Sequence, residues 1–302
     1  MENLDNLVTE SVNENSKNID ALSTIEMVKI INTEDSKVAD AVGKESENIA
    51  KAIDEIAKRY IKGGRLIYIG AGSSGRMGTL DAVELTPTYN VSPERAFGLI
   101  AGGKEAMYRA VEGAEDSREL GREDLVNCKL SNLDCVVGIA ASGRTPYVLG
   151  GLDYAKEIGA LTVMISSNRN ENVEKSADIV ITPIVGAEVI SGSTRMKSGT
   201  AAKMVVNSIS TGVMIKSGMV YGNYMVNVLP TNKKLETRAI RMISSITGVD
   251  IEKSSKLFEE SGKSVAVSII MNKASIDKDK AQKLLKESNN MVRIAIEKAK
   301  SA

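Results

Sequence analysis

A glycine-rich turn directly after a short apolar run constrains the fold of this chain more than any other feature. Residues 66–69 (Leu-Ile-Tyr-Ile) are typical of a strand buried on both faces of a parallel sheet. The three glycines within 70–75 then let the backbone turn tightly and approach a ligand, because glycine has no Cβ. Residues 77–85 predict a helix that ends before Pro87. This order of elements predicts an α/β fold with an anion site at the helix N-terminus.

The same turn has the Gly-x-Gly-x-x-Gly spacing of dinucleotide-binding proteins, so two classes of ligand compete for it. A dinucleotide site needs an acidic residue about 20 positions further on, at the end of the second strand, to bind the ribose. The next apolar run, 96–100, ends instead in Ala-Gly-Gly, without a carboxylate. This argues against a nicotinamide or flavin cofactor. It favours a phosphate-binding turn in which Ser73 and Ser74 add hydroxyl donors.

The composition excludes several other classes of function. The 39 basic and 39 acidic residues cancel and only 3% of residues are aromatic, so we expect no nucleic-acid or membrane partner. The chain has no histidine, which excludes Ser-His and Cys-His triads and most metal sites. Cys128 and Cys135 lack the spacing of a zinc knuckle or a redox pair, and no apolar run approaches the ~20 residues of a membrane span. We expect a cytoplasmic protein without a bound metal.

Beyond the first turn, strands and helices alternate. Apolar runs predict strands at 96–100, 134–141, 161–165 and 178–184. Helical patterns lie between them at 104–112, 116–125, 146–158 and 170–176. This spacing predicts right-handed crossovers and a doubly wound parallel sheet of about five strands.

Helical segments flank the α/β region on both sides. We expect residues 1–20 to form a loosely packed arm. The sequence from Ser23 to Glu26 predicts the capped start of a helix, and we expect the apolar face of that helix to pack on the sheet or on a second subunit. Residues 36–60 predict one further helix, and 251–292 a small three-helix bundle. We therefore expect an N-terminal part, a ligand-binding α/β domain and a helical C-terminal domain, at 1–60, 61–230 and 231–302.

A second hydroxyl-bearing turn follows the third predicted strand. There Ser142, Gly143, Arg144 and Thr145 precede Pro146, a residue suited to the first position of a helix. Two such turns, after strands one and three, belong at the switch point of a sheet with strand order 2-1-3, where a crevice forms. The pair favours a small phosphorylated ligand, although tight turns kept for packing would show the same pattern.

A third hydroxyl-rich stretch, 188–200, precedes a long apolar helix predicted over 201–215. Ser193 and Thr194, with the basic residues beside them, would suit a helix start that faces a ligand. Serine and threonine are also ordinary helix caps. Both interpretations stay open at this stage.

Taken together, these motifs resemble the sugar isomerase (SIS) domain and, within that group, closely resemble the N-acetylmuramic acid 6-phosphate etherases. The resemblance extends from about Asn18 to about Arg238. The segments that carry it are 18–26, 69–76, 111–117, 141–147, 190–197 and 220–226. One departure follows Glu84, where Leu-Thr-Pro-Thr-Tyr replaces the family's Cys-Pro-Pro-Thr-Phe. This changes the neighbours of the carboxylate but not the carboxylate itself.

The resemblance implies a carbon–oxygen lyase that acts without a cofactor. Such an enzyme cleaves the D-lactyl ether of N-acetylmuramic acid 6-phosphate to N-acetylglucosamine 6-phosphate and D-lactate, in recycling or catabolism of cell-wall sugars. The family's two catalytic glutamates match Glu84, as the acid, and Glu115, as the base that later activates water. The alternatives are an aldose–ketose sugar-phosphate isomerase and a non-catalytic sugar-phosphate sensor similar to the glucokinase regulatory protein. A sensor would not need both glutamates.

Local context agrees with these two roles. Two carboxyl groups in opposite protonation states suffice for the reaction, as a chain without histidine requires. The helix dipole favours a protonated Glu84 at a helix end and an ionised Glu115 near a helix start, by about 0.3–1 kcal/mol each. Because a helix rises ~1.5 Å per residue, we expect Glu84 over ~10 Å from the turn at its own helix start. We therefore expect a homodimer in which one subunit binds the phosphate and the other contributes a carboxylate.

Overall fold

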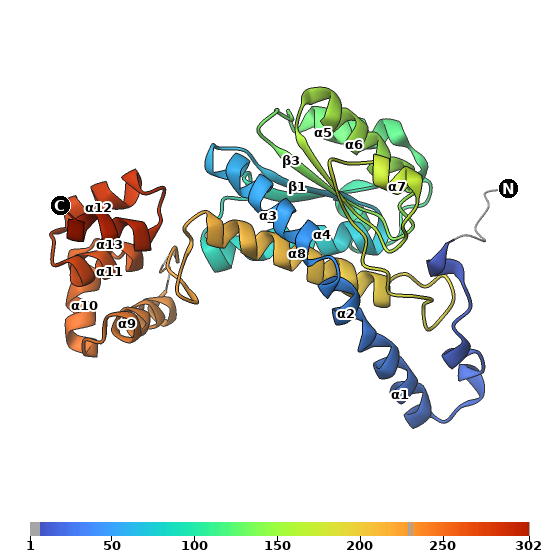
Figure 1. The fold of residues 1–302 in the computed structure, drawn as a ribbon, viewed down its shortest axis with the longest axis horizontal. Helices are drawn as coiled ribbons and strands as arrows, with labels where there is room; N and C mark the ends of the chain where they lie inside the picture. The colour runs from blue at the N-terminus through green and yellow to red at the C-terminus, as the bar shows by residue number, and fades with distance from the viewer. Residues whose placement is uncertain (1–6, 229, 231, 302) are drawn as a thin grey trace. The chain divides into compact units, whose positions relative to one another are not determined.

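The computed structural model describes residues 7–228, 230 and 232–301, and its first compact unit contains a parallel sheet of five strands (Figure 1). This unit comprises residues up to 83 and residues 93–210. Its strands are β1 (Leu66–Gly70), β2 (Ala96–Ile100), β3 (Cys135–Ile139), β4 (Leu161–Ile165) and β5 (Ile179–Ile181). They lie in the order β2-β1-β3-β4-β5, and all neighbours are parallel. The predicted doubly wound sheet and its switch point between β1 and β3 are confirmed.

Helices cover both faces of the sheet, as a sheet with two buried faces requires. The α-helices that begin in this unit are α1 (Thr24–Asp35), α2 (Lys37–Gly43), α3 (Ser46–Ile61), α4 (Gly72–Tyr89), α5 (Arg118–Asn127), α6 (Pro146–Ile158), α7 (Glu171–Lys175) and α8 (Lys197–Lys216). On one face α6 packs on β1, β3 and β4, and α5 packs on α6. On the other face the Tyr68 hydroxyl donates to Asp81 of α4 and lies beside the Val206 carbonyl of α8. Residues alternate between these two faces along each strand.

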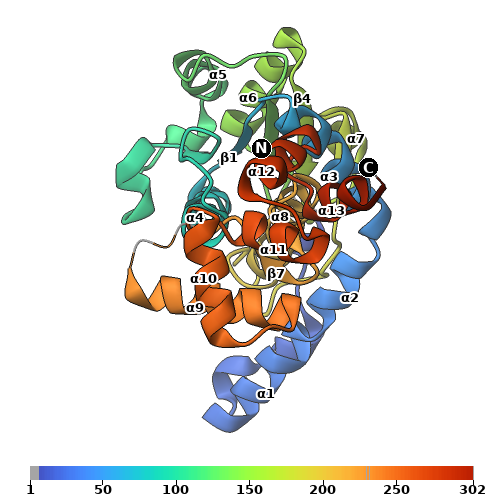
Figure 2. The same ribbon diagram turned by 90° about the vertical axis from the view of Figure 1, so that its left-hand side faces the viewer.

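The second compact unit, residues 84–92 and 211 onward, is mainly helical (Figure 2). It holds the hairpin of β6 (Val220–Tyr221) and β7 (Tyr224–Met225) and five helices: α9 (Lys233–Thr247), α10 (Ile251–Glu260), α11 (Val265–Ala274), α12 (Lys278–Glu287) and α13 (Val292–Ser301). Ile243, Phe258 and Ile269 lie in their common core. The predicted three helices over 251–292 are confirmed as α10, α11 and α12. The predicted domain limits at 60/61 and 230/231 stay predictions.

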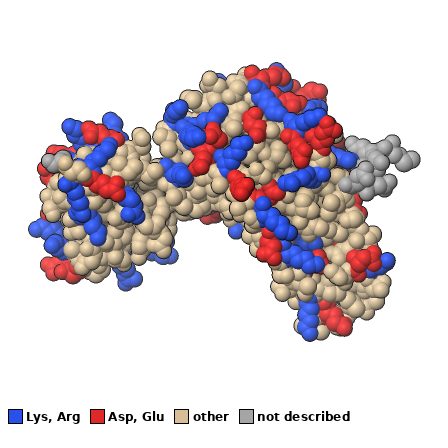
Figure 3. Space-filling view, viewed as in Figure 1, with Lys and Arg blue, Asp and Glu red and all other residues tan. Residues whose placement is uncertain are grey.

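Charged side chains of both signs are interspersed on the face of the molecule that Figure 3 shows. That face carries no extended patch of one sign, the feature that binding to a nucleic-acid backbone requires. Within the described part of the chain, no helix combines the length and the apolar character needed to cross a membrane.

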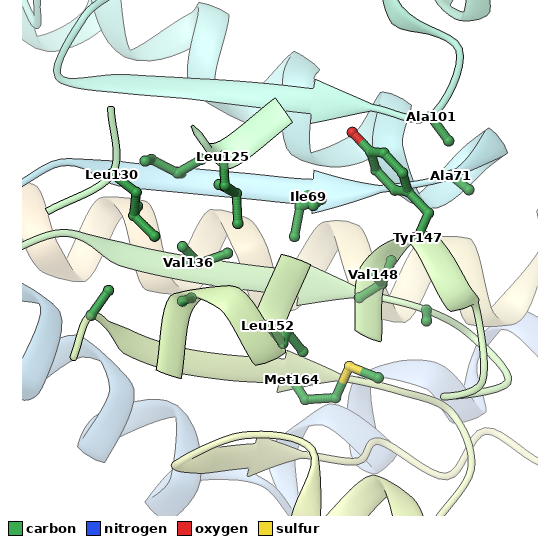
Figure 4. Packing of buried hydrophobic residues seen from close by; sticks show 14 of the residues in the cluster. Ile69, Ala71, Ala101, Leu125, Leu130, Val136, Tyr147, Val148, Leu152 and Met164 are labelled. Carbon is green, nitrogen blue, oxygen red and sulfur yellow. The ribbon is translucent and has the colours of Figure 1, made fainter. Parts of the chain in front are cut away.

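The core between the sheet and the α5–α6 layer fixes the position of the strand ends (Figure 4). Ile69 and Val136 from the strands meet Leu152 of α6, and all three side chains are completely buried. Each such burial stabilises the fold by about 1.5–3 kcal/mol. The two helices approach closely because a Cβ on Gly121 of α5 would lie only 1.9 Å from the Tyr147 carbonyl oxygen of α6. The turns that follow β1 and β3 therefore start from a rigid base.

The helix after the first strand differs from its prediction at both ends. The structure starts α4 at Gly72 rather than residue 77, and the helix continues through Pro87 to Tyr89. Proline removes only one backbone donor, and the helical pattern resumes beyond it, since Asn90 N–H donates to the Thr86 carbonyl at 2.9 Å. Leu85 is buried and anchors this last part of the helix.

Two other helix predictions are wrong in detail. The segment 104–112 forms only a 3-10 turn (Gly103–Met107), which the chain enters through Gly102 and Gly103, both with left-handed backbone angles. The single helix predicted over 36–60 is two, α2 and α3, and the chain between them passes through the buried Glu45.

The N-terminal arm is packed rather than loose over the residues that the structure describes. Leu7, Thr9, Asn13 and Ser16 are all buried. The prediction of a loosely packed tail is therefore wrong for 7–20, and residues 1–6 lie outside the described residues. The apolar face predicted for the next helix does not pack on the sheet, since Ile25 is 60% exposed.

Candidate active site

A cavity of about 400 Å³ opens at the carboxyl edge of the sheet, where the turns after β1 and β3 meet. Seven of the predicted site residues line it: Ser73, Ser74, Glu115, Ser142, Arg144, Thr145 and Thr194. Three others, Glu84, Gly143 and Ser193, do not. The cavity is thus built at the switch point of the sheet, the place where α/β proteins bind ligands.

The start of α4 presents unpaired backbone donors to this cavity. The first intrahelical hydrogen bond runs from Gly75 N–H to the Ala71 carbonyl at 3.2 Å, so the N–H groups of Gly72, Ser73 and Ser74 have no acceptor within the helix. Gly70 and Gly75 approach so closely that a Cβ on Gly70 would lie 2.7 Å from the Gly75 nitrogen. Gly72 itself has φ +51°, a left-handed angle that glycine adopts without strain.

The start of α6 has the same construction. Pro146 is its first residue, as predicted. The Ser142 hydroxyl accepts a hydrogen bond from Arg144 N–H at 3.2 Å, which orients the turn. Gly143 has φ +73° and is buried, and a Cβ there would lie 2.2 Å from Val173. Gly143 therefore shapes the turn, and a direct contact with ligand stays a prediction.

The start of α8 differs, because the chain itself closes it. The completely buried Glu188 accepts hydrogen bonds from the backbone N–H groups of Lys197 and Ser198, both at 2.9 Å. The Lys197 ammonium donates to Glu34 at 2.8 Å, and both side chains are 2% exposed. The cap of α8 is thus the Glu188 carboxylate rather than a serine or threonine hydroxyl, and both interpretations of Ser193 and Thr194 stay predictions. From this stretch, Gly192 and Thr194 line the cavity.

The two predicted catalytic carboxylates lie in different places. Glu115 belongs to a single 3-10 turn (Ala114–Asp116), is exposed and lines the cavity beside Asp116. Glu84 is exposed on α4 ten positions after Ser74. At the rise of an α-helix, Ser74 and Glu84 lie about 15 Å apart along the axis of α4. Glu84 therefore does not face the cavity that begins at its own helix start.

A buried polar cluster holds α4 in place three residues before Glu84. Asp81, 5% exposed, accepts hydrogen bonds from the Tyr68 hydroxyl at 2.7 Å, the Asn207 amide at 2.6 Å and the Ser210 hydroxyl at 3.0 Å. Burial raises the pKa of Asp81 despite these bonds. The cluster joins α4 to β1 and α8, which fixes the direction of the helix.

Four residues at or near the site are not among those predicted from the sequence. Glu10 lines the cavity, Asn168 anchors the N-terminal arm, and Glu34 and Glu188 close the start of α8. No sequence spacing identifies these residues. Glu10, Asn168 and Glu34 contact segments that are distant along the chain, and an irregular loop separates Glu188 from the helix start that it binds.

A larger hollow of about 590 Å³ lies in the second compact unit. Tyr224, Arg238 and Met242 are among its lining residues, and none of the predicted site residues is. The helix N-termini and the Glu115 carboxylate belong to the cavity in the first unit, so we take that one as the candidate active site.

The fold and this cavity define an SIS-domain protein. Residues 48–156 match the family model described as the glucokinase regulatory protein N-terminal SIS domain.

Curated relatives narrow the assignment. An N-acetylmuramic acid 6-phosphate etherase of Lactobacillus gasseri is 59% identical over 268 residues, which cover 89% of this chain and 90% of that protein. One of Clostridium beijerinckii is 58% identical over 269 residues, covering 89% and 88%. N-acetylmuramic acid 6-phosphate etherase 1 of Enterococcus faecalis is 54% identical over 271 residues, covering 90% of both chains. This chain belongs to the N-acetylmuramic acid 6-phosphate etherase family, and the resemblance seen in its motifs is confirmed.

Proposed function

We propose that this chain cleaves the D-lactyl ether of N-acetylmuramic acid 6-phosphate and releases N-acetylglucosamine 6-phosphate and D-lactate. One observation carries the proposal within the family: two open helix N-termini with hydroxyl groups share a cavity with the Glu115 carboxylate. A cavity of about 400 Å³ suits a single phosphorylated sugar.

The phosphate binds between the starts of α4 and α6. Backbone N–H groups and the positive dipole end of each helix favour an anion there. Ser73, Ser74, Ser142 and Thr145 add hydroxyl donors, and Arg144 adds a cation at the cavity wall. These charge-assisted bonds hold the open-chain sugar by its sixth carbon and leave carbons two and three for the chemistry.

The reaction is an elimination followed by addition of water. The C2 proton is acidic because it lies beside the aldehyde, and Glu115 removes it. The C3–O bond to the lactyl group then breaks, and Glu84 protonates the departing oxygen. Glu115 then releases the C2 proton to solvent, deprotonates the water that adds at C3, and returns that proton to C2. Glu84 regains its proton from solvent, so the C3 hydroxyl group is restored and both carboxyl groups return to their starting states. One carboxyl group starts ionised and the other protonated, which is the pairing that acid–base chemistry without histidine requires.

The acid comes from a second copy of the chain. Glu84 lies about 15 Å along α4 from the phosphate-binding turn, too far to reach carbon three of a sugar held there. Leu80 and Val83, beside Glu84 on the helix surface, are 52% and 60% exposed, a face suited to a homodimer contact. Each site then combines the phosphate cradle and Glu115 of one chain with Glu84 of its partner.

Mixing two inactive variants tests this arrangement. Glu84→Gln chains and Glu115→Gln chains are each expected to be inactive alone. Co-expressed, they form mixed dimers in which one site has both carboxylates, so activity returns. Mixed dimers that form but stay inactive would rule out a shared site.

The activity itself is tested by D-lactate release from N-acetylmuramic acid 6-phosphate and from its unphosphorylated form. We expect release from the phosphorylated sugar, and in ¹⁸O-labelled water the label enters at C3. A sugar-phosphate isomerase would leave C3 unlabelled, and a sensor would release no D-lactate. Equal rates on both substrates would contradict the phosphate-binding role of the two helix starts.

The substrate also suggests where the protein acts. Sugar phosphates are charged and do not cross membranes unaided, so we infer a cytoplasmic enzyme. The two cysteines, Cys128 and Cys135, are both unpaired, which agrees with a reducing compartment.

A further inference from the structure

The N-terminal arm is fastened to the carboxyl edge of the sheet by one buried asparagine. The Asn168 side chain, 2% exposed, accepts a hydrogen bond from Val8 N–H at 2.8 Å and donates to the Thr9 hydroxyl at 3.1 Å. It also donates to the Ala141 carbonyl at 2.8 Å, directly before Ser142 of the phosphate-binding turn. One side chain thus holds both the arm and the turn in fixed positions.

Two more contacts hold the arm against the segment that leads to Thr194. Asn13 donates to the Ala187 carbonyl at 3.1 Å, and Ser16 donates to the Val189 carbonyl at 2.6 Å. A Cβ on Gly192 would lie 3.2 Å from Oε2 of Glu10. The arm is therefore part of the cavity wall.

Between these anchors, Glu10 directs a carboxylate to the cavity. It ends the short 3-10 turn Val8–Glu10, is exposed, and lines the cavity together with Glu115. No other described residue forms a hydrogen bond or ion pair with its side chain. Thr9, directly before Glu10, and Asn13, three residues after it, are buried, so the position of Glu10 is fixed from both sides although its carboxylate has no partner among the described residues.

The charge of Glu10 decides which part of a ligand it faces. A carboxylate repels a phosphate oxygen placed beside it, and this repulsion is much stronger in a protein cavity than in bulk water. The phosphate is therefore excluded from the end of the cavity near Glu10. The remaining part of a sugar phosphate carries hydroxyl and amide N–H donors, and a carboxylate accepts hydrogen bonds from both.

We propose that Glu10 accepts hydrogen bonds from the sugar portion of the ligand and determines that this cavity prefers a sugar phosphate to phosphate alone. The inference rests on the proposed function in one respect, that the cavity binds a phosphorylated sugar. Glu10 is a specificity-determining residue here and takes no part in proton transfer.

Glu10→Gln is the informative variant, because it keeps the shape of the side chain and removes the charge. Glu14→Gln is the matched control, since Glu14 lies on the same arm, pairs with Lys17 at 3.4 Å and does not line the cavity. Isothermal titration of wild type and both variants uses two probes, N-acetylglucosamine 6-phosphate and inorganic phosphate. We expect Glu10→Gln to weaken binding of the sugar phosphate about ten-fold and to leave inorganic phosphate unchanged or bound more tightly. The control should match wild type, and all three proteins should melt at the same temperature.

Unchanged affinity of Glu10→Gln for the sugar phosphate would overturn the inference. So would an equal loss with both probes, because that result would mean that the arm only supports the cavity wall. Failure of the proposed function is separate: a wild type that binds the sugar phosphate but releases no D-lactate refutes the reaction, and the same titrations still decide the role of Glu10.

Discussion

Three helices of the first unit begin in hydroxyl-rich turns. The backbone N–H groups at the start of one of them are bound by other residues of the chain, whereas, within the part of the chain that the structure describes, those of the other two are not. Among the described residues, the first backbone N–H groups of α4 and α6 have no capping partner, and both helix starts line the cavity. The start of α8 is closed by Glu188 and by the buried pair of Lys197 with Glu34. We therefore expect a serine- and glycine-rich turn to bind a ligand only where the chain supplies no carboxylate of its own. Open starts should govern binding, and the closed start should govern stability.

The largest effect that we expect is a loss of stability when the closed start of α8 is disrupted. Lys197→Met removes the buried cation that pairs with Glu34 and leaves only the half-exposed Lys37 beside this carboxylate, so we expect the free energy of unfolding to fall by about 3 kcal/mol. Urea denaturation measures this. Lys203→Met, an exposed lysine on the same helix, is the control and should change stability by less than about 0.5 kcal/mol. A Lys197→Met protein as stable as wild type would show that the pair does not close the helix start.

The dependence of stability on acidic pH tests the same interaction of Glu34, with a smaller expected effect. Burial raises the pKa of Glu34, but the hydrogen bonds from Lys197, Lys37 and Asn15 outweigh burial and lower it to about 2. Because the folded pKa lies below the ordinary 4.5, the ionised carboxylate stabilises the fold fully above pH 4.5 and loses that effect as pH falls through about 2.

Between pH 7 and pH 3, the stability of wild type should therefore drop by about 2 kcal/mol more than that of Glu34→Gln. Denaturation curves at the two pH values give this double difference, in which other titrating groups cancel. A difference near zero would mean that the carboxylate is not held ionised by its partners.

The open helix starts were predictable from the sequence because their signals are local. A buried strand, glycines at fixed spacing and a following helix lie within a dozen residues, and the sheet order then follows from the alternation of elements. Glu115 and Glu84 came from family resemblance rather than from such a pattern. Their assignment to acid and base stays a prediction.

The closed helix start and the packed arm were not predictable, because distant residues make them. Glu34 reaches Lys197 from α1, and Asn168 binds Val8 across 160 positions of the chain. A local pattern contains no information on such pairings, so the same Ser-Gly-Ser-Thr turn could be assigned to a ligand or to a cap. The helix predicted over 104–112 is wrong in a different way: the chain enters this segment through two left-handed glycines, Gly102 and Gly103, and forms only the 3-10 turn Gly103–Met107.

The smallest effect we expect compares one serine from each kind of helix start. Ser142→Ala removes a hydroxyl that lines the cavity and that accepts the Arg144 N–H bond, so KM should rise roughly five-fold, about 1 kcal/mol, with little change in unfolding free energy. Ser198→Ala is its counterpart at the closed start. The Ser198 hydroxyl is buried and has no hydrogen-bond partner in the described part of the chain, so its removal costs no bond and should leave KM unchanged. A similar rise in KM for both variants would mean that the α8 start also binds ligand, and the distinction between open and closed starts would fail.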